Sequence, residues 1–188
     1  MQGTTSTLAA VYKEGTHYKI AKPAGKVAQP EVTEFFSYGC PHCFDVEPAV
    51  HAWHSAASKV KLNRIAVVGF RPEWDLLAKA YYTAEVLGIT EKMHLAMFER
   101  VHKERKLLAN EQELAQFLSG FGVTEQQVMG TVNSFAVNNL MNSASQKQSE
   151  FRISGVPAFI VNDKYFTDVT MMGGNNGVAP VLNYLSSK

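Results

Sequence analysis

The chain of 188 residues contains only two cysteines, Cys40 and Cys43, so no other cysteine in the sequence can form a disulfide with either of them. The two must pair with each other or with another molecule. A low cysteine count suits a reducing cytosol, but it equally suits an oxidising compartment in which stray thiols would be trapped. The count therefore points to the chemistry of one dithiol and leaves the compartment open.

An excess of charge of either sign is also lacking, because 18 basic residues face 17 acidic ones and the net charge is +1. This balance gives no indication of binding to nucleic acid or to an anionic membrane surface. The longest apolar runs, such as Ile65 to Phe70, are far too short to cross a bilayer. With 46% hydrophobic residues, the chain has enough apolar side chains to form a buried core without stabilising disulfides or metal ions.

A signal peptide is not visible in this sequence, because Met1 to Thr7 has neither a basic start nor an apolar stretch. The chain is expected to be either a cytosolic protein or the mature form of an exported one. Residues 1 to about 10 are expected to form a mobile terminus.

The most informative motif is Cys40-Pro41-His42-Cys43, which comes directly after a strand-like run, Val32 to Phe36. The cysteines thus fall where a strand should give way to a helix. Pro41 suits the first helical position, where its missing N–H loses nothing. A helix N-terminus carries free N–H groups and partial positive charge, which favour a thiolate over a thiol. The motif predicts a redox-active dithiol.

The two sulfurs are expected to play different roles. Cys40 should sit at the exposed tip of the helix and act as the nucleophile, while Cys43 lies a turn deeper and should resolve the mixed disulfide. His42 stands between them and can offer a hydrogen bond or positive charge to the Cys40 sulfur.

A structural cysteine pair, or half of a metal site, is the alternative interpretation. Zinc needs four ligands, and a second cysteine pair is absent. His51 and His54 follow Cys43 too closely for the usual finger spacing. We therefore predict no metal site, and we expect His51, His54, His94 and His102 to lie on helix surfaces.

The pattern of apolar residues predicts a mixed α/β fold. Expected strands are 18–20, 32–37, 61–68, 158–161 and 165–167, the last two joined by a hairpin turn at 162–164. Expected helices in this part are one from Pro41 through Trp53 and a final one over 178–185. Strands and helices thus alternate at both ends of the chain, as in an α/β domain.

Between about 72 and 153 the sequence predicts helices only. They cover 76–87 and 95–101, a third opened by Asn110, a fourth opened by Thr124 and carrying Val128, Val132 and Phe135, and a polar segment over about 142–151. We read this block as a helical insertion that interrupts the α/β domain.

Three motifs together resemble a known family. Glu34-Phe35-Phe36-Ser37, the Cys-Pro-His-Cys motif and the distant Gly155-Val156-Pro157 are similar to those of DsbA, the bacterial periplasmic family that donates disulfides. The likeness extends from about Val11 to the end. It implies a thioredoxin-like fold with an inserted all-helical domain, with residues 1–71 and 154–188 forming the thioredoxin-like part and 72–153 the insertion.

The resemblance also implies roles for residues outside the dithiol motif. Pro157 would be a cis-proline facing the disulfide, and Val156 would offer backbone groups to an extended substrate by strand addition. The residues alone favour an ordinary trans proline at the start of an edge strand, because few X–Pro bonds are cis. Met171, Met172 and Gly173 would border the substrate groove.

Glu34 resembles the family's buried acid beneath the active site, which helps proton movement at the inner cysteine. Arg64, on the next strand, looks like its basic partner. A carboxylate in an apolar run is costly to bury unless it is paired. The alternative is that strand alternation turns Glu34 toward solvent.

By resemblance, the chain is an oxidising thiol:disulfide oxidoreductase that gives disulfides to exported proteins. It would be periplasmic and monomeric, with no bound cofactor and no nucleic-acid partner. A DsbB-like membrane quinone reductase would reoxidise it, so that quinone is used only indirectly.

Three alternatives remain open at this point. A disulfide reductase or isomerase would use the same residues, since direction depends on the reduction potential. A metal-binding or metal-delivery protein would use the two sulfurs as ligands. A noncatalytic chaperone would carry the dithiol as a vestige.

Overall fold

The computed structural model describes residues 11–188, so the expected mobile terminus lies outside the described residues. Its strands are β1 (Lys19–Ile20), β2 (Glu31–Phe36), β3 (Lys61–Ala66), β4 (Ala158–Val161) and β5 (Tyr165–Asp168). Its helices are α1 (Pro41–Ala56), α2 (Pro72–Leu87), α3 (Thr90–His102), α4 (Glu111–Ser119), α5 (Glu125–Thr131), α6 (Phe135–Glu150) and α7 (Val178–Ser186), with a short 3-10 turn, η1, at Asn175–Gly177. Among these helices, none has both the length and the hydrophobicity needed to cross a membrane.

The five strands form one mixed sheet in the order β1-β5-β4-β2-β3. β2 runs parallel to β3 and antiparallel to β4, which places it in the interior of the sheet. The register sets Glu34 directly opposite Arg64 on β3 and opposite Phe159 on β4. The α/β fold class predicted from the sequence is confirmed, and β2 is the strand that leads into the active-site helix.

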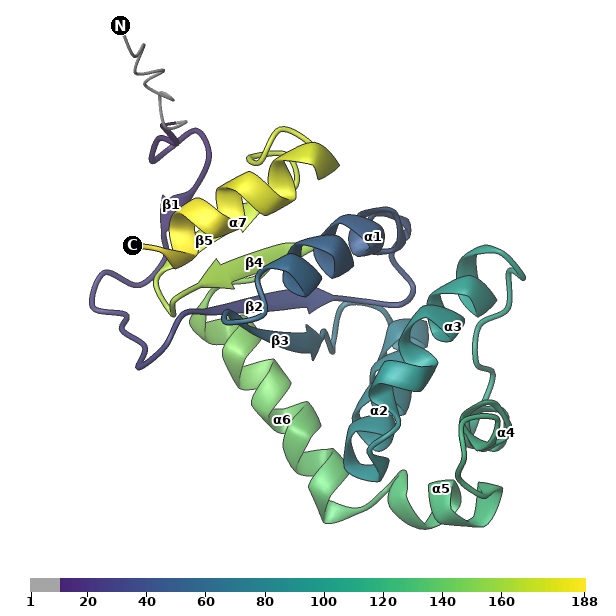
Figure 1. Ribbon diagram of the computed structural model, residues 1–188. Coiled ribbons are helices and arrows are strands. Elements are labelled where there is room, and N and C mark those ends of the chain that lie inside the picture. Colours follow the sequence, from purple (N-terminus) through teal and green to yellow (C-terminus); the bar gives the residue numbers. More distant parts are fainter. Residues whose placement is uncertain (1–10) are drawn as a thin grey trace, which may run out of the picture.

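Helices α1 and α7 lie side by side against one face of this sheet (Figure 1). Alternation along β4 points Phe159 and Val161 into the core beneath these two helices. Ala158 and Ile160 point to the opposite face, where they pack with Phe151 beyond the end of α6. Because Glu34 is in register with Phe159, its side chain faces the side covered by α1.

Helices α2 to α6 follow one another between β3 and β4 and lie to one side of the sheet (Figure 1). Their apolar faces pack on one another and on the loop that carries the cysteines, in a core that includes Tyr38, Cys43, Tyr81 and Phe98. The helical block therefore packs directly against the two cysteines. We propose residues 72–153 as the insertion.

Three local expectations can be compared directly with the structure. The hairpin turn is confirmed, because Asn162 and Asp163 both adopt positive φ angles between β4 and β5. The helix expected to open at Thr124 forms, but its expected continuation through Phe135 is wrong. It ends at Thr131, and Phe135 instead begins α6, where Ser134 accepts a hydrogen bond from the N–H of Val137. The polar segment expected over 142–151 is the second half of this longer helix.

Candidate functional site

The dithiol motif begins α1. Cys40 is the N-cap residue in an extended conformation, and Pro41 occupies the first turn as expected. The N–H of Cys40 donates to the carbonyl of Ser37 (3.1 Å), and the carbonyl of Cys40 accepts from the N–H of Phe44 (3.2 Å). Both cysteines carry free thiols in this structure. The loop thus holds the Cys40 sulfur at the positive end of the helix.

The surroundings of Cys40 favour its thiolate. The Cys43 thiol, which donates to the Cys40 sulfur, makes the largest contribution to lowering the pKa of Cys40 to about 6 from its usual value near 9. The backbone N–H groups of Cys43 and His42 act in the same direction, and the His42 side chain adds a smaller electrostatic effect, while burial opposes them. The helix N-terminus expected from the sequence is present, but the Cys43 thiol lowers the pKa of Cys40 more than the His42 side chain does.

Cys43 is completely buried, and burial raises the pKa of its thiol well above the ordinary range. Cys40 is more accessible, but only 5% of its surface is exposed, so the expected exposed tip is wrong. The reason is the packing of Tyr38 and of the loop at Val156 around it. Pro41 and His42 are the exposed residues of the motif.

Val156 and Pro157 lie beside the first cysteine. The peptide bond between them is cis, as the family resemblance implied. The Cys40 thiol donates a hydrogen bond to the carbonyl oxygen of Val156, with a sulfur–oxygen distance of 3.6 Å. The chain between α6 and β4 is thereby brought against the start of α1, although the two segments are far apart in the sequence.

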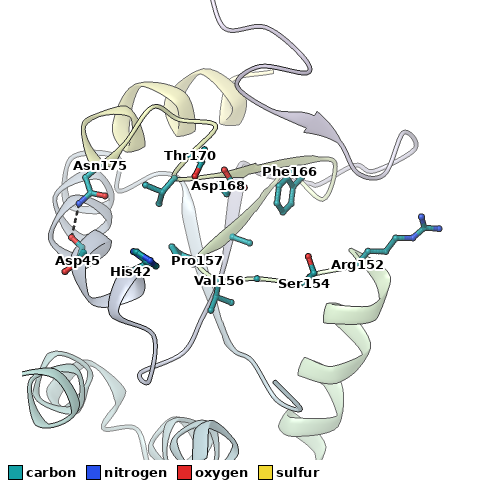
Figure 2. Close-up of a pocket in the computed structure, with 13 residues that line it drawn as sticks. His42, Asp45, Arg152, Ser154, Val156, Pro157, Phe166, Asp168, Thr170 and Asn175 are labelled. Atoms are coloured by element: carbon teal, nitrogen blue, oxygen red, sulfur yellow. Dashed lines mark hydrogen bonds between the residues drawn. The ribbon is translucent and has the colours of Figure 1, made fainter. Parts of the chain in front are cut away.

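A groove of about 450 Å³ runs past this contact (Figure 2). Figure 2 shows His42 and Asp45 on one side and the segment from Ser154 to Pro157 on the other. The residues that line it are His42, Asp45, Arg152, Ser154, Gly155, Val156, Pro157, Ala158, Phe166, Asp168, Val169, Thr170 and Asn175. Met171, Met172 and Gly173 were expected here and do not line it. Met172 is instead buried in the core under α7.

Glu34 is buried, with 1% of its surface exposed, and it is paired with Arg64. The Arg64 Nε atom lies 3.4 Å from Glu34 Oε1, close enough for an ion pair but out of line for a hydrogen bond. Burial, with the nearby charge of Glu47, outweighs Arg64 and raises the pKa of Glu34 to about 8. The charge of Glu34 also contributes to raising the pKa of Cys43. The burial and the partner are confirmed, whereas the role in proton transfer stays a prediction.

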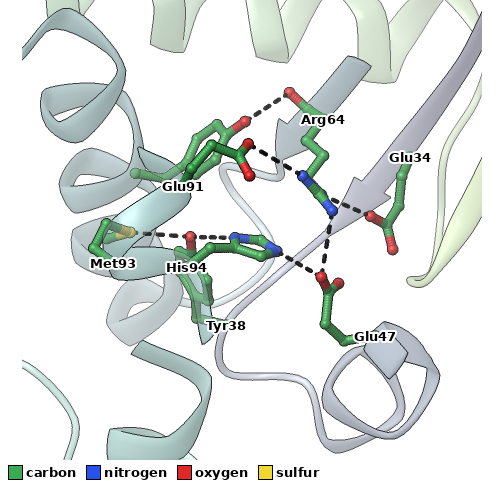
Figure 3. A network of polar contacts seen from close by, with 8 residues as sticks. Glu34, Tyr38, Glu47, Arg64, Glu91, Met93 and His94 are labelled. Atoms are coloured by element: carbon green, nitrogen blue, oxygen red, sulfur yellow. Dashed lines mark hydrogen bonds and ion pairs between the residues drawn. The ribbon is translucent and has the colours of Figure 1, made fainter. Parts of the chain in front are cut away.

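Sequence reasoning missed a set of polar residues that surround this pair (Figure 3). Glu47 accepts a hydrogen bond from Arg64 Nη2 (3.3 Å) and lies 3.3 Å from His94 Nε2. The other ring nitrogen of His94 is 2.7 Å from the hydroxyl of Tyr38. Glu47 follows Cys43 by four residues and so shares its helix face, which is a signal that could have identified it.

The expectation that the four histidines lie on helix surfaces is wrong for two of them. Only 6% of His94 is exposed. His102 is half-buried, donates to the backbone carbonyl of Tyr38 (2.7 Å) and stacks on the ring of Phe44. Both residues belong to α3, whose contact with the active-site loop no local pattern revealed. His51 is exposed, and His54 is half-buried beside Trp53.

Gly39, in the loop before Cys40, lies close against the helical block. A Cβ atom at this position would lie 2.1 Å from Trp74 Nε1. Trp74 is in the first turn of α2, so its indole leaves no room for a side chain at position 39. Within residues 11–188, no three His, Cys, Asp or Glu side chains gather into a possible metal site.

Comparisons with known proteins agree with this geometry. Residues 64–185 match the DsbA-like thioredoxin domain family. The chain is 36% identical to the thiol:disulfide interchange protein DsbA of Azotobacter vinelandii over 171 residues, covering 90% of this chain and 78% of that protein. It is 35% identical to the Pseudomonas aeruginosa DsbA over 181 residues, covering 94% and 85%.

Among solved structures, a crystal structure of a Pseudomonas aeruginosa DsbA variant superposes with a TM-score of 0.87 at 32% identity, covering 94% of this chain and 97% of that one. The family model thus matches the part of the chain that follows the two cysteines, while the relatives and the solved structure cover 90% or more of the chain. The chain belongs to the DsbA family of thioredoxin-like thiol:disulfide oxidoreductases.

Proposed function

We propose that the protein works as an oxidant, donating the Cys40–Cys43 disulfide to other proteins. The observation that carries this direction is the low pKa of Cys40, about 6, against a raised pKa at Cys43. A stabilised Cys40 thiolate favours the reduced enzyme, and an enzyme that is more stable when reduced gives its disulfide away readily. A reductase would need the opposite preference.

The first step is attack by a substrate thiolate on the Cys40 sulfur of the oxidised enzyme. A new bond forms between the substrate sulfur and Cys40 while the Cys40–Cys43 bond breaks, so the electron pair passes to Cys43. A second substrate thiolate then attacks the substrate sulfur of the mixed disulfide. Cys40 leaves as a thiolate, the substrate gains a disulfide, and the enzyme holds two more electrons. Cys40 is favoured as the leaving group because a sulfur of low pKa leaves faster.

Glu34 is the group that we assign to proton transfer at Cys43. Cys43 is fully buried and becomes negative when the disulfide opens, which is unfavourable without a proton. With a pKa of about 8, Glu34 carries a proton near neutral pH and can act as its source. In the reverse step, the Glu34 carboxylate would accept the proton before Cys43 attacks a mixed disulfide.

The groove beside Cys40 supports binding of an extended polypeptide. Val156, next to the cis peptide bond, offers backbone groups to such a chain by strand addition. Exposed His42 and Pro41 leave the end of α1 open to a large substrate. We therefore propose unfolded or folding exported proteins as substrates and the periplasm as the compartment.

The electrons gained must leave the enzyme after each turnover. We propose a DsbB-like membrane quinone reductase as the reoxidising partner, with quinone as the acceptor beyond it. The two sulfurs carry the whole exchange, so the reaction requires no bound cofactor. We propose that the protein acts as a monomer.

Serine variants at the two cysteines test this assignment. Oxidised wild-type protein should introduce disulfides into a reduced, unfolded substrate, and Cys40→Ser should lose this activity. Cys43→Ser cannot form the disulfide and should likewise introduce none. When it is mixed with a substrate that already carries a disulfide, its Cys40 thiolate should displace one substrate sulfur and accumulate as a mixed disulfide, since the resolving thiol is gone. Full activity in Cys40→Ser would refute the proposal, and a reduction potential as low as that of thioredoxin, roughly −270 mV, would reverse its direction.

A further inference from the structure

The buried polar network beneath the active site contains a histidine that the proposed chemistry does not use. His94, on α3, connects the helical block to the active-site helix (Figure 3). Its Nε2 atom lies 3.3 Å from Glu47 Oε1, and its Nδ1 atom lies 2.7 Å from the Tyr38 hydroxyl. With so little exposure, both ring nitrogens depend on protein groups rather than on solvent for polar contacts.

The two contacts are consistent with a proton on Nε2. A carboxylate oxygen can only accept, so the ring nitrogen that faces Glu47 is favoured as a donor. The Tyr38 hydroxyl, which also lies 3.4 Å from Met93 Sδ, can either donate to Nδ1 or accept from it. Nε2 is slightly out of line with the carboxylate, so the contact is electrostatic rather than a well-formed hydrogen bond.

Glu47 and Glu34 compete for one arginine. Arg64 reaches Glu47 through Nη2 at 3.3 Å and Glu34 through Nε at 3.4 Å. Glu47 Oε1 is shared between Arg64 and His94, whereas Arg64 is the one cation paired with Glu34 among the described residues. If His94 did not face Glu47, that carboxylate would depend on Arg64 alone.

We propose that His94 is a positioning residue for disulfide exchange: its contact with Glu47 leaves Arg64 available to Glu34, the acid that acts on Cys43. The inference rests on the proposed function, because it concerns the proton that Cys43 gains or loses. It also gives α3 of the helical block a part in the chemistry.

Other charged and titratable groups around the ring set the background for this effect. Tyr38 belongs to the loop before α1, Tyr81 to α2 and Glu91 to α3, and each lies near His94 or Arg64. Glu91 is 91% exposed at its side chain and 3.9 Å from Arg64, so solvent screens it. Glu85 on α2 acts on Tyr38 and Tyr81 over a longer distance. Within this set, Glu47 is the carboxylate within ion-pair distance of the imidazole.

The test follows the rate at which Cys43 resolves a preformed mixed disulfide between Cys40 and a chromogenic aromatic thiol, measured against pH. The rate should rise with pH as Glu34 loses its proton, and this rise is identified by its absence in Glu34→Gln. In His94→Gln its midpoint should move upward by about 1 pH unit, because Arg64 is drawn toward Glu47 and compensates Glu34 less. His51→Gln, an exposed histidine on α1, is the matched control and should leave the midpoint unchanged.

A Glu47→Gln background separates positioning from simple damage to the structure. Without the Glu47 charge, Arg64 is no longer divided between two acids, so adding His94→Gln should produce little further shift. An equal midpoint in His94→Gln and His51→Gln would overturn the inference, as would the same shift with and without Glu47. A wild-type protein that donates disulfides normally would leave the proposed function standing in either case.

A measurement on the unaltered protein covers the possibility that His94→Gln does not fold. Nitrogen-15 NMR of the reduced wild-type protein should find a proton on His94 Nε2 at neutral pH. An unprotonated Nε2 would overturn the inference. Because this readout involves no substrate, it stands independently of whether Cys40→Ser loses activity.

Discussion

The sulfur of Cys40 lies 3.6 Å from the carbonyl oxygen of Val156, and its thiol donates to that oxygen. Ionised Cys40 has no proton to give, so the thiolate must rely on the N–H groups of α1 and on the Cys43 thiol instead. The same carbonyl stands at the edge of the groove where a substrate chain would approach. The contact therefore joins the redox centre to a residue that lines the groove.

The first prediction concerns the ionisation of Cys40. In the reduced protein its thiolate should form with a midpoint near pH 6, followed by ultraviolet absorbance of the thiolate. Cys43→Ala should raise this midpoint by more than about 1 pH unit, because it removes the largest stabilising hydrogen bond. Cys40→Ser serves as the control and should show no thiolate step in this range. An ordinary cysteine midpoint in the wild-type protein would contradict the prediction.

The second prediction concerns stability against pH. The pKa of Cys40 is lower in the folded protein, about 6, than the usual value near 9, so the folded thiolate stabilises the reduced form. This contribution is full above pH 9 and declines as pH falls, with a slope of about 1.4 kcal/mol per pH unit, until it is lost below pH 6.

Denaturant unfolding of the oxidised and reduced proteins across this range measures the effect. The free energy of unfolding of the reduced form should exceed that of the oxidised form at neutral pH, and the excess should disappear in mild acid. An oxidised form that is the more stable at every pH would show that the disulfide is not readily given up.

The third prediction concerns Gly39. Gly39→Ala should destabilise the protein by about 1–3 kcal/mol, because the added Cβ would lie 2.1 Å from Trp74 Nε1 and the indole would have to move. Gly130→Ala is the matched control: it lies in α5 with no atom within 4 Å of the new Cβ, and should be stabilising by about 0.5–1 kcal/mol. The urea concentration at the midpoint of unfolding, measured for both variants and the wild type, gives the stability change of each variant. Equal midpoints would mean that the loop adapts without cost.

The fourth prediction concerns Glu34. Glu34→Gln should slow resolution of a mixed disulfide by Cys43 roughly 10²-fold or more, since it removes the group that takes the buried proton. The pH dependence with a midpoint near 8 should vanish with it. Glu91→Gln, which removes an exposed carboxylate near the same arginine, is the control and should change the rate little. A normal pH profile in Glu34→Gln would assign the proton transfer to another group.

Several features of the site were predictable from local sequence. Pro41 following a strand-like run placed Cys40 at the start of a helix, and the capping box at Thr124 and Gln127 formed as expected. The cis peptide at Pro157 was not predictable in this way, because the residues allow either isomer and only the family resemblance favoured cis. The start of α6 at Phe135 was missed because that residue, 85% exposed, continued an apolar pattern without being part of a buried face.

By itself the sequence determined the dithiol, its place at a helix N-terminus and the order of strands and helices, because these depend on neighbouring residues. Only the tertiary structure decided that Glu47 and His94 join the Glu34–Arg64 pair that the family resemblance had implied. Helical periodicity shows which face of α3 is apolar, but not which distant helix it contacts. The charge balance beneath the active site, and with it the pKa of each buried group, therefore arises from long-range packing.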